Sequence, residues 1–264
     1  MIGRVVVVGA GPSGLACALE LVAHGPVTLV ERTPVVGGEV GWRDPFMRQL
    51  GEKAASRGVD FALGSIALRW EVSRLLVASP GRIDWIPAST LFFAGGLRPG
   101  TAKDVGIHGD RPAGIIPATV ALHLLEADVP LWTNVVVLGS GKWADHVVDA
   151  VGKLGGRVTA VSVDSSGTKT ADKSITNAHS FRAVGRSRIE YLDFVADGLP
   201  ERLACDALIL AGDPRPNRNV EGALIEPASG VVFVQPLNVI TATDRYDAAR
   251  QLSSDWLLAQ RGNA

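Results

Sequence analysis

The sequence predicts an α/β fold with parallel sheets, and three observations support this. The β-branched run Arg4–Val8 leads into the glycine-rich stretch Gly9–Gly14, and an amphipathic segment follows. The same order recurs between residues 133 and 154. Each copy continues into a second apolar strand that ends on an acid, Glu31 in the first and Asp164 in the second. We therefore expect two Rossmann-like dinucleotide-binding domains.

The composition is that of a globular protein with a sizeable core. Of 264 residues, 47% are hydrophobic and 20% are charged, and the formal net charge is −1. A charge so close to zero gives no field that would attract nucleic acid. No stretch reaches the ~20 apolar residues of a membrane span, and the apolar strand that starts at Val5 leaves no room for a signal peptide. We expect a cytoplasmic protein.

Each residue type in the N-terminal turn has a physical role. Gly9 permits a tight turn from strand to helix, Gly11 lets the backbone approach a pyrophosphate, and Gly14 lets the helix pack against the strand. The helix N-terminus offers free N–H groups to the phosphates, and Glu31 can accept hydrogen bonds from an adenosine ribose. The residues predicted to bind a dinucleotide here are Gly9, Gly11, Pro12, Ser13, Gly14 and Glu31.

The second copy departs from the ideal pattern. Ala144 replaces the third glycine, and the bulky Trp143 follows Lys142 beside the expected phosphate position. Asp164 suits the ribose of NAD better than that of NADP, whereas Lys142 leaves the choice open. Two interpretations stay open, a nicotinamide nucleotide site and a structural repeat. The candidate residues are Gly139, Ser140, Gly141, Lys142, Trp143 and Asp164.

Three further segments resemble the superfamily of FAD/NAD(P)-dependent pyridine-nucleotide oxidoreductases, which includes thioredoxin reductase and glutathione reductase. They are Arg32–Glu39 with its paired glycines, Leu91–Pro99, and Cys205–Asn217. Gly95 stands where the family has threonine. The resemblance implies FAD in the first site and makes NAD(H) the candidate for the second. It implies further FAD contacts by Arg32, Gly38, Ala67, Ala94, Gly95 and Asn238.

A narrower resemblance concerns Ile107–Thr119. This segment is similar to one in the FAD/NAD-type subunits of amine and amino-acid dehydrogenases, a group that includes hydrogen cyanide synthase, opine oxidase, hydroxyproline dehydrogenase and dye-linked proline dehydrogenase. The resemblance implies an FAD-dependent oxidoreductase, working with a partner subunit or as a homo-oligomer. Electrons would pass from a small-molecule substrate through flavin to a nicotinamide or a partner carrier.

Two departures keep other functions open. The chain lacks the cysteine-rich tail of many such subunits, and the family's final flavin-binding Gly-Asp is missing from Val232–Asn238. A non-catalytic subunit that binds FAD or another adenine nucleotide is the main alternative. A stand-alone NAD(P)H:acceptor reductase is the third.

The resemblance also implies that each domain has three layers (ββα) and that the second domain is inserted in the first. The FAD domain would comprise residues 1–102 and 225–264, with the nucleotide domain at 103–224 between them. A small β-meander is expected within residues 58–87, and its strands would be Val59–Trp70, Arg74–Ala78 and Arg82–Ile86. Helices are expected at Pro117–Ala127, Ala144–Leu154 and Tyr246–Gln260, the last with its N-terminus toward the flavin.

No catalytic side chain can be named from the sequence. Glu39, Trp42 and Arg43 follow the paired glycines and are candidates to approach the flavin ring, and Arg43 could bind a substrate carboxylate or form a surface ion pair. The five histidines show no metal-ligand spacing, so no metal is expected. Cys17 and Cys205 form no Cys-x-x-Cys pair and are expected in the core.

Overall fold

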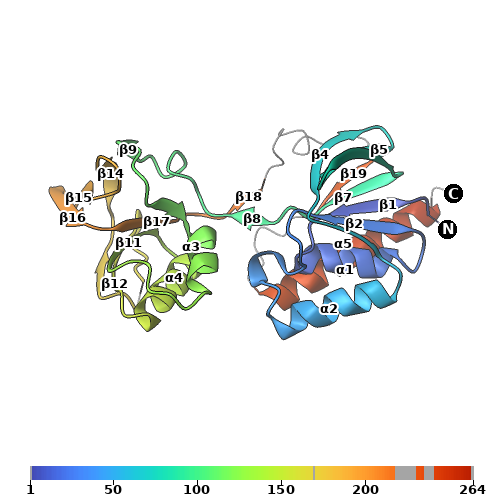
Figure 1. Cartoon of the computed structure of the whole chain (residues 1–264), viewed down its shortest axis with the longest axis horizontal. Helices are drawn as coiled ribbons and strands as arrows, with labels where there is room; N and C mark the ends of the chain where they lie inside the picture. Colours follow the sequence, from blue (N-terminus) through green and yellow to red (C-terminus); the bar gives the residue numbers. More distant parts are fainter. Residues whose placement is uncertain (1, 169, 218–229, 235–240, 263–264) are drawn as a thin grey trace. The chain divides into compact units, whose positions relative to one another are not determined.

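The computed structural model describes residues 2–168, 170–217, 230–234 and 241–262. The chain divides into two compact units (Figure 1). Unit 1 comprises Met1–Leu97 and Pro216–Ala264, and unit 2 comprises Arg98–Arg215. No helix in the described part of the chain is both long enough and apolar enough to cross a bilayer.

Unit 1 is built on a parallel five-stranded sheet in the order β19-β7-β1-β2-β3. Its strands are β1 (Val5–Val8), β2 (Val27–Glu31), β3 (Asp60–Leu63), β7 (Thr90–Phe93) and β19 (Val231–Phe233). One face carries the helices α1 (Pro12–Leu21), α2 (Pro45–Ser56) and α5 (Ala242–Gly262). The other face carries an antiparallel sheet of β4 (Ile66–Glu71), β5 (Arg74–Ser79) and β6 (Arg82–Pro87) (Figure 1).

The sheet of unit 1 is covered on both faces, which explains the run of valines in β1. Val5 and Val7 belong to the apolar core beneath the helices, together with Leu15 of α1. Val6 belongs to a second core, which it shares with Leu75 of the antiparallel sheet. All three valines are fully buried. The sheet therefore forms the middle layer of three.

Local signals begin the helices of unit 1. The first residue of α1 is Pro12, which suits a position whose N–H would have no partner in the helix. The carboxylate of Asp44 accepts hydrogen bonds from the backbone N–H groups of Phe46 and Met47 and so caps α2. Ahead of α5, the Thr241 hydroxyl accepts from the backbone N–H of Asp244. Each helix start is thus fixed by residues close in the sequence.

Unit 2 repeats the three layers. Its parallel sheet has the order β10-β17-β11-β12-β13. These strands are β10 (Ile115–Pro117), β11 (Asn134–Gly139), β12 (Arg157–Val161), β13 (Lys173–Ile175) and β17 (Ala207–Ala211). The helices α3 (Ala118–Leu125) and α4 (Lys142–Lys153) lie on one face. A sheet of β9 (His108–Gly109), β14 (His179–Val184), β15 (Tyr191–Ala196) and β16 (Leu199–Ala204) packs on the other, where Leu138, Phe181 and Leu208 share one core.

Several sequence-based boundaries were wrong. The strand expected over Val59–Trp70 is two strands, because the chain turns at Gly64, whose φ is +63°. The first of them, β3, joins the parallel sheet beside β2 rather than the meander. α5 begins four residues earlier than expected, at Ala242, and α4 begins two residues earlier, at Lys142. Neither α2 nor the strands β13–β16 were predicted from the sequence.

Short strands lie where the chain passes between the units. β8 (Leu97–Arg98) and β18 (Arg215–Pro216) pair as a two-stranded sheet. The side chain of Asn217 then donates a hydrogen bond to the carbonyl oxygen of Gly95, at 3.0 Å, within unit 1. The units therefore divide after Leu97 and after Arg215, compared with expected boundaries after 102 and after 224.

Candidate nucleotide-binding sites

The N-terminal turn of unit 1 needs glycine at two positions for space. Gly9 has a φ of +102°, and a β-carbon there would overlap the carbonyl oxygen of Ala94 at the end of the neighbouring strand. A β-carbon on Gly14 would overlap the carbonyl oxygen of Gly9. Both glycines therefore hold the strand end, the turn and α1 in direct backbone contact.

Gly11 has a different role. It caps α1 with a φ of −78°, a conformation open to any residue, and a β-carbon there would lie 3.8 Å from its nearest neighbour, the Cα of Gly38. A β-carbon on Gly11 would therefore be in ordinary van der Waals contact with Gly38 and would not clash. Close approach of a pyrophosphate to the N-terminus of a helix favours a residue without a side chain at such a position.

Glu31, at the end of β2, is tied to the same turn. Its Oε2 accepts a hydrogen bond from the backbone N–H of Ala10 at 2.8 Å. Its Oε1 accepts from the backbone N–H and the hydroxyl of Thr33, at 2.9 and 3.0 Å. A carboxylate offers about four acceptor positions, so capacity remains for a ribose hydroxyl. Glu31 is only 8% exposed, and its charge is held beside the glycine turn.

The paired glycines form a second loop against the first. The backbone N–H of Gly37 donates to the carbonyl oxygen of Ala10 at 2.9 Å. Gly38 starts a short 3-10 helix, η1 (Gly38–Val40), and faces Gly11 so closely that a β-carbon on Gly38 would lie 3.0 Å from the Cα of Gly11. The two glycine loops therefore pack against each other backbone to backbone.

The other residues predicted to contact FAD have varied environments. Arg32 is exposed beside Glu31, and the side chain of Ala67 is buried in the core under the antiparallel sheet. Ala94 donates its backbone N–H to Val8 at 2.8 Å. The ring of Phe93 occupies the space that a β-carbon on Gly95 would take. Asn238 lies outside the described residues.

The residues after the paired glycines have partners within unit 1. Glu39 forms an ion pair with Arg245 of α5 at 3.1 Å. The guanidinium of Arg43 lies 5.6 Å from the ring centre of Trp42, which is 49% exposed. This geometry is a cation–π contact at the surface. It leaves the role of Arg43 toward a substrate as a hypothesis.

Unit 2 repeats the close contact of the first glycine. Gly139 has a φ of +130°, and a β-carbon there would overlap the carbonyl oxygen of Ala211 at the end of β17. The second glycine differs, because Gly141 has a φ of +81° with no atom within 4 Å of its would-be β-carbon. Ala144 is fully buried in α4, and Trp143 is only 6% exposed. Most of the Trp143 surface is thus covered by protein.

A cavity of about 380 Å³ opens beside this turn. Of the predicted residues, Gly139, Ser140 and Asp164 line it. Sequence reasoning did not assign the other lining residues, which are Gly100, Asp104, Val105, Val163, Gly212, Asp213 and Arg215. These residues follow the carboxyl ends of β12 and β17 or come from the segment that enters unit 2. A cavity at the carboxyl ends of parallel strands is where dinucleotides bind in such sheets.

Two aspartates of the cavity wall are held as carboxylates. Hydrogen bonds from Ser166 and Ser140 lower the pKa of Asp164 below its ordinary value of 3.8. Hydrogen bonds from the backbone and side chain of Thr101, and from Arg98, hold the pKa of Asp104 well below the same value. Both carboxylates therefore stay charged at neutral pH. Among the lining residues that were not predicted, Gly212, Asp213 and Arg215 lie in Cys205–Asn217, the segment that resembles a family strand.

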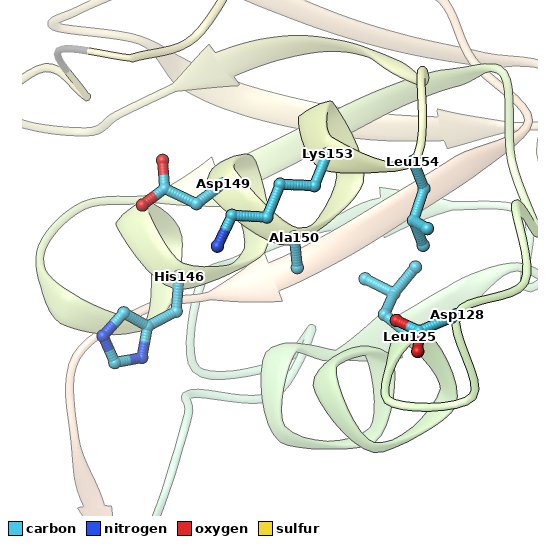
Figure 2. Close-up of a pocket in the computed structure, with 7 residues that line it drawn as sticks. All are labelled: Leu125, Asp128, His146, Asp149, Ala150, Lys153 and Leu154. Atoms are coloured by element: carbon cyan, nitrogen blue, oxygen red, sulfur yellow. The ribbon is translucent and has the colours of Figure 1, made fainter.

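A smaller hollow of about 280 Å³ lies between α3 and α4. Figure 2 shows Leu125 and Leu154 facing each other at one end, with His146 and Asp149 extending from α4 at the other. It has neither a glycine turn nor a helix N-terminus among its lining residues. It therefore lacks the features that mark the dinucleotide sites.

In the described part of the chain, the cysteines form no disulfide and the possible metal ligands form no cluster. Both cysteines are free and buried, and burial raises the pKa of the Cys17 thiol to about 12 and that of Cys205 to about 12. Among the residues that the structure describes, no three His, Cys, Asp or Glu side chains gather as metal ligands. The glycine turn of each unit therefore remains the candidate site in the described chain.

The fold and these sites define a two-domain dinucleotide-binding protein. The family model of pyridine nucleotide-disulphide oxidoreductases matches residues 3–185, and the chain belongs to this family. Members of the family are FAD-dependent enzymes, and the family binds FAD and NAD(P)H. The sequence has no significant match among curated proteins.

Solved structures show the same fold at low sequence identity. An NAD-dependent persulfide reductase from A. fulgidus superposes with a TM-score of 0.74 at 14% identity, over 96% of this chain and 58% of that one. An L-proline dehydrogenase from P. horikoshii gives 0.69 at 19%, over 99% and 56%. A thioredoxin reductase from Lactococcus lactis gives 0.67 at 13%, over 96% and 97%. The chain spans little more than half the length of the first two.

Proposed function

We propose that this chain is an FAD-dependent oxidoreductase acting as a subunit of an amine or amino-acid dehydrogenase. Unit 1 would hold FAD and unit 2 would hold NAD(H). The observation that carries the proposal is the repeated site: in each unit a glycine contacts the neighbouring strand end, and an acid ends or follows the second strand. The acids are Glu31 and Asp164.

The substrate class rests on two observations. Ile107–Thr119 is similar to a segment of amine and amino-acid dehydrogenase subunits, and the fold is like that of the proline dehydrogenase. In such a reaction FAD would supply a hydride acceptor, and the protein would bind and orient it beside the substrate. Here the backbone of Gly9–Gly14 and Gly38 would hold the diphosphate, and Glu31 would hold the ribose.

One sequence observation favours a second function. The Gly-Asp that contacts the flavin near the C-terminus in the family is missing from 232–238. A subunit that binds FAD or another adenine nucleotide without reacting would keep the Glu31 site and lose this contact. The third function, a stand-alone NAD(P)H:acceptor reductase, differs from both because reduced nicotinamide would be its electron donor.

The visible absorption spectrum of the purified protein tests these functions. We expect a flavin spectrum, either as isolated or after FAD is added. Anaerobic bleaching by an amine or amino acid would support the dehydrogenase, and bleaching by NADH alone would favour the reductase. Bound flavin that no donor bleaches would support the non-catalytic subunit. A protein that takes up no FAD would contradict the proposal.

We expect Asp164→Asn to weaken NADH binding about tenfold and to leave NADPH binding less affected. The variant loses a charged acceptor for the ribose hydroxyls, and a hydrogen bond to a charged group is worth about 1.5–3 kcal/mol. Fluorescence titration of both nucleotides measures the change. Asp149→Asn, on an exposed part of α4, is the matched control.

The contribution of Asp164 to NADH binding should also depend on pH and should decrease only at acidic pH. Because the pKa of Asp164 is lowered, its carboxylate stays charged from neutral pH down to its ordinary value of 3.8. The contribution of Asp164 to NADH binding should therefore be constant across mildly acidic pH and fall only as the carboxylate is protonated. Unchanged NADH binding in Asp164→Asn would show that this carboxylate does not contact the nucleotide.

A further inference from the structure

The strand β6 forms a free edge of the antiparallel sheet of unit 1. In the described part of the chain this sheet has the order β4-β5-β6, and no strand pairs with β6 on the side away from β5. Arg82, Ile83 and Asp84 are all exposed at this edge, and Ile83 is 64% exposed. An edge strand offers unpaired backbone groups with which another chain can pair.

The backbone of β6 directs two residues toward the free edge. Just beyond the last pair of β5 and β6, the backbone N–H of Ala88 donates to the carbonyl oxygen of Ser73 at 2.9 Å. Hydrogen-bonded and non-hydrogen-bonded pairs alternate along an antiparallel ladder, so every second residue of β6, counted back from Ala88, bonds to β5. The residues between them include Ile83 and Trp85, whose N–H and C=O groups therefore point away from β5.

The charges on β6 suit pairing with an identical strand. Arg82 and Asp84 flank Ile83 and form an ion pair at 3.1 Å, with both side chains more than half exposed. If two copies of β6 pair antiparallel about a two-fold axis at Ile83, Arg82 of each copy lies opposite Asp84 of the other. These are non-hydrogen-bonded positions, where side chains on paired strands come closest. Opposite charges would therefore meet on both sides of the axis.

Neighbouring registers lack this match. An axis at Asp84 would set the two Asp84 side chains opposite each other, and like charges directly opposite destabilise a pair of strands. An axis at Trp85 would set Pro87 opposite Ile83, and proline has no N–H to donate to the Ile83 carbonyl. With the axis at Ile83, the two Ile83 residues can exchange both of their backbone hydrogen bonds.

An apolar row across the sheet favours the same register. Ile83 lies opposite Ala78 of β5, which lies opposite Ile66 of β4. Val77, next to Ala78, is buried in the core, so this row lies on the other face of the sheet. Ile66 at one end is 43% exposed. In the paired sheets the row would continue into the second copy, and contact between the two Ile83 side chains would remove apolar surface from water.

We propose that β6 is a dimerisation strand, through which two copies of this chain join their antiparallel sheets edge to edge about a two-fold axis at Ile83. This inference concerns the surface of unit 1, goes beyond the proposed function and does not depend on it. A single pair of strands is a small interface, so we expect a reversible dimer with a dissociation constant of about 1–100 μM.

Charge reversal in the full chain tests the partner and the register together. Arg82→Asp sets an aspartate opposite Asp84, and Asp84→Arg sets an arginine opposite Arg82, so each variant alone should dimerise at least about tenfold more weakly. An equimolar mixture of the two variants matches acid with base at both positions and should form dimers again. The double variant Arg82→Asp/Asp84→Arg should also dimerise like the wild type. Sedimentation velocity over a concentration series measures the dissociation constants.

Arg69→Gln is the matched control, because it removes an exposed arginine of β4 that pairs with Glu71. It should leave the dimer unchanged. In the wild-type protein, hydrogen exchange at the Ile83 amide should slow as the dimer forms, a readout that needs no variant. A protein that stays monomeric throughout the series would overturn the inference. A dimer that neither reversal weakens, or a mixture that dimerises no better than its two components, would equally show that β6 is not the interface.

Discussion

Replacing Gly14 by alanine should destabilise unit 1 by about 3 kcal/mol, because the new β-carbon would overlap the carbonyl oxygen of Gly9. The overlapping atom is backbone, at the junction of β1 and α1, so no side-chain rotation can relieve it. Relief requires the helix to move away from the strand, which opens the core around Leu15. Thermal unfolding followed by circular dichroism measures the loss, as a lower transition temperature for unit 1.

Two other alanine variants make this prediction specific. Gly152→Ala, in α4 with no atom within 4 Å, should stabilise its helix by about 0.5–1 kcal/mol. Gly11→Ala should fold normally, since its φ of −78° suits alanine and its nearest neighbour is 3.8 Å away. Yet Gly11→Ala should bind FAD at least about tenfold more weakly, because its methyl group enters the space for the diphosphate. A Gly14→Ala protein as stable as wild type would contradict the packing described for α1.

The second large effect is expected for Glu31→Gln, which should weaken FAD binding by roughly ten- to a hundredfold and destabilise unit 1 by about 1–3 kcal/mol. Three donors point at the carboxylate, from Ala10 and from the backbone and hydroxyl of Thr33. The glutamine amide has one oxygen and one NH₂ group. In either orientation its NH₂ group therefore faces at least one of these three donors, and that hydrogen bond is lost. Titration with FAD and thermal unfolding measure the two losses separately.

Glu52→Gln is the control for this variant, because Glu52 is exposed on α2 and its charge change is the same. It should leave both FAD binding and stability near the wild-type values. If Glu31→Gln lost stability but kept its FAD affinity, Glu31 would be only a support for the glycine turn. That outcome would move the ribose contact to another residue and weaken the case for FAD in unit 1.

Both Rossmann-like folds could be predicted from the sequence because their signals are local. A strand buried on both faces must be apolar along its whole length, as Val5–Val8 is. In the turn that follows, glycine is needed at the positions where two backbone segments touch. The spacing of Gly9 and Gly14 in the sequence therefore indicates where the strand, the turn and the helix are in contact. The acid that ends the second strand of unit 1 is set by the same short unit. The glycine turn of unit 1 and the acid beside it could therefore be predicted from the first 38 residues.

Features that depend on contacts between distant segments were decided only by the tertiary structure. The apolar pattern of 59–70 could not show that the chain turns at Gly64, or that β3 pairs with β2 while β4 joins another sheet. Nothing near Glu39 in the sequence marks Arg245 as its partner. The cavity wall of unit 2 likewise combines Asp104, from the segment that enters the unit, with Asp213, which follows β17. Residues so far apart in the sequence meet only in the folded chain.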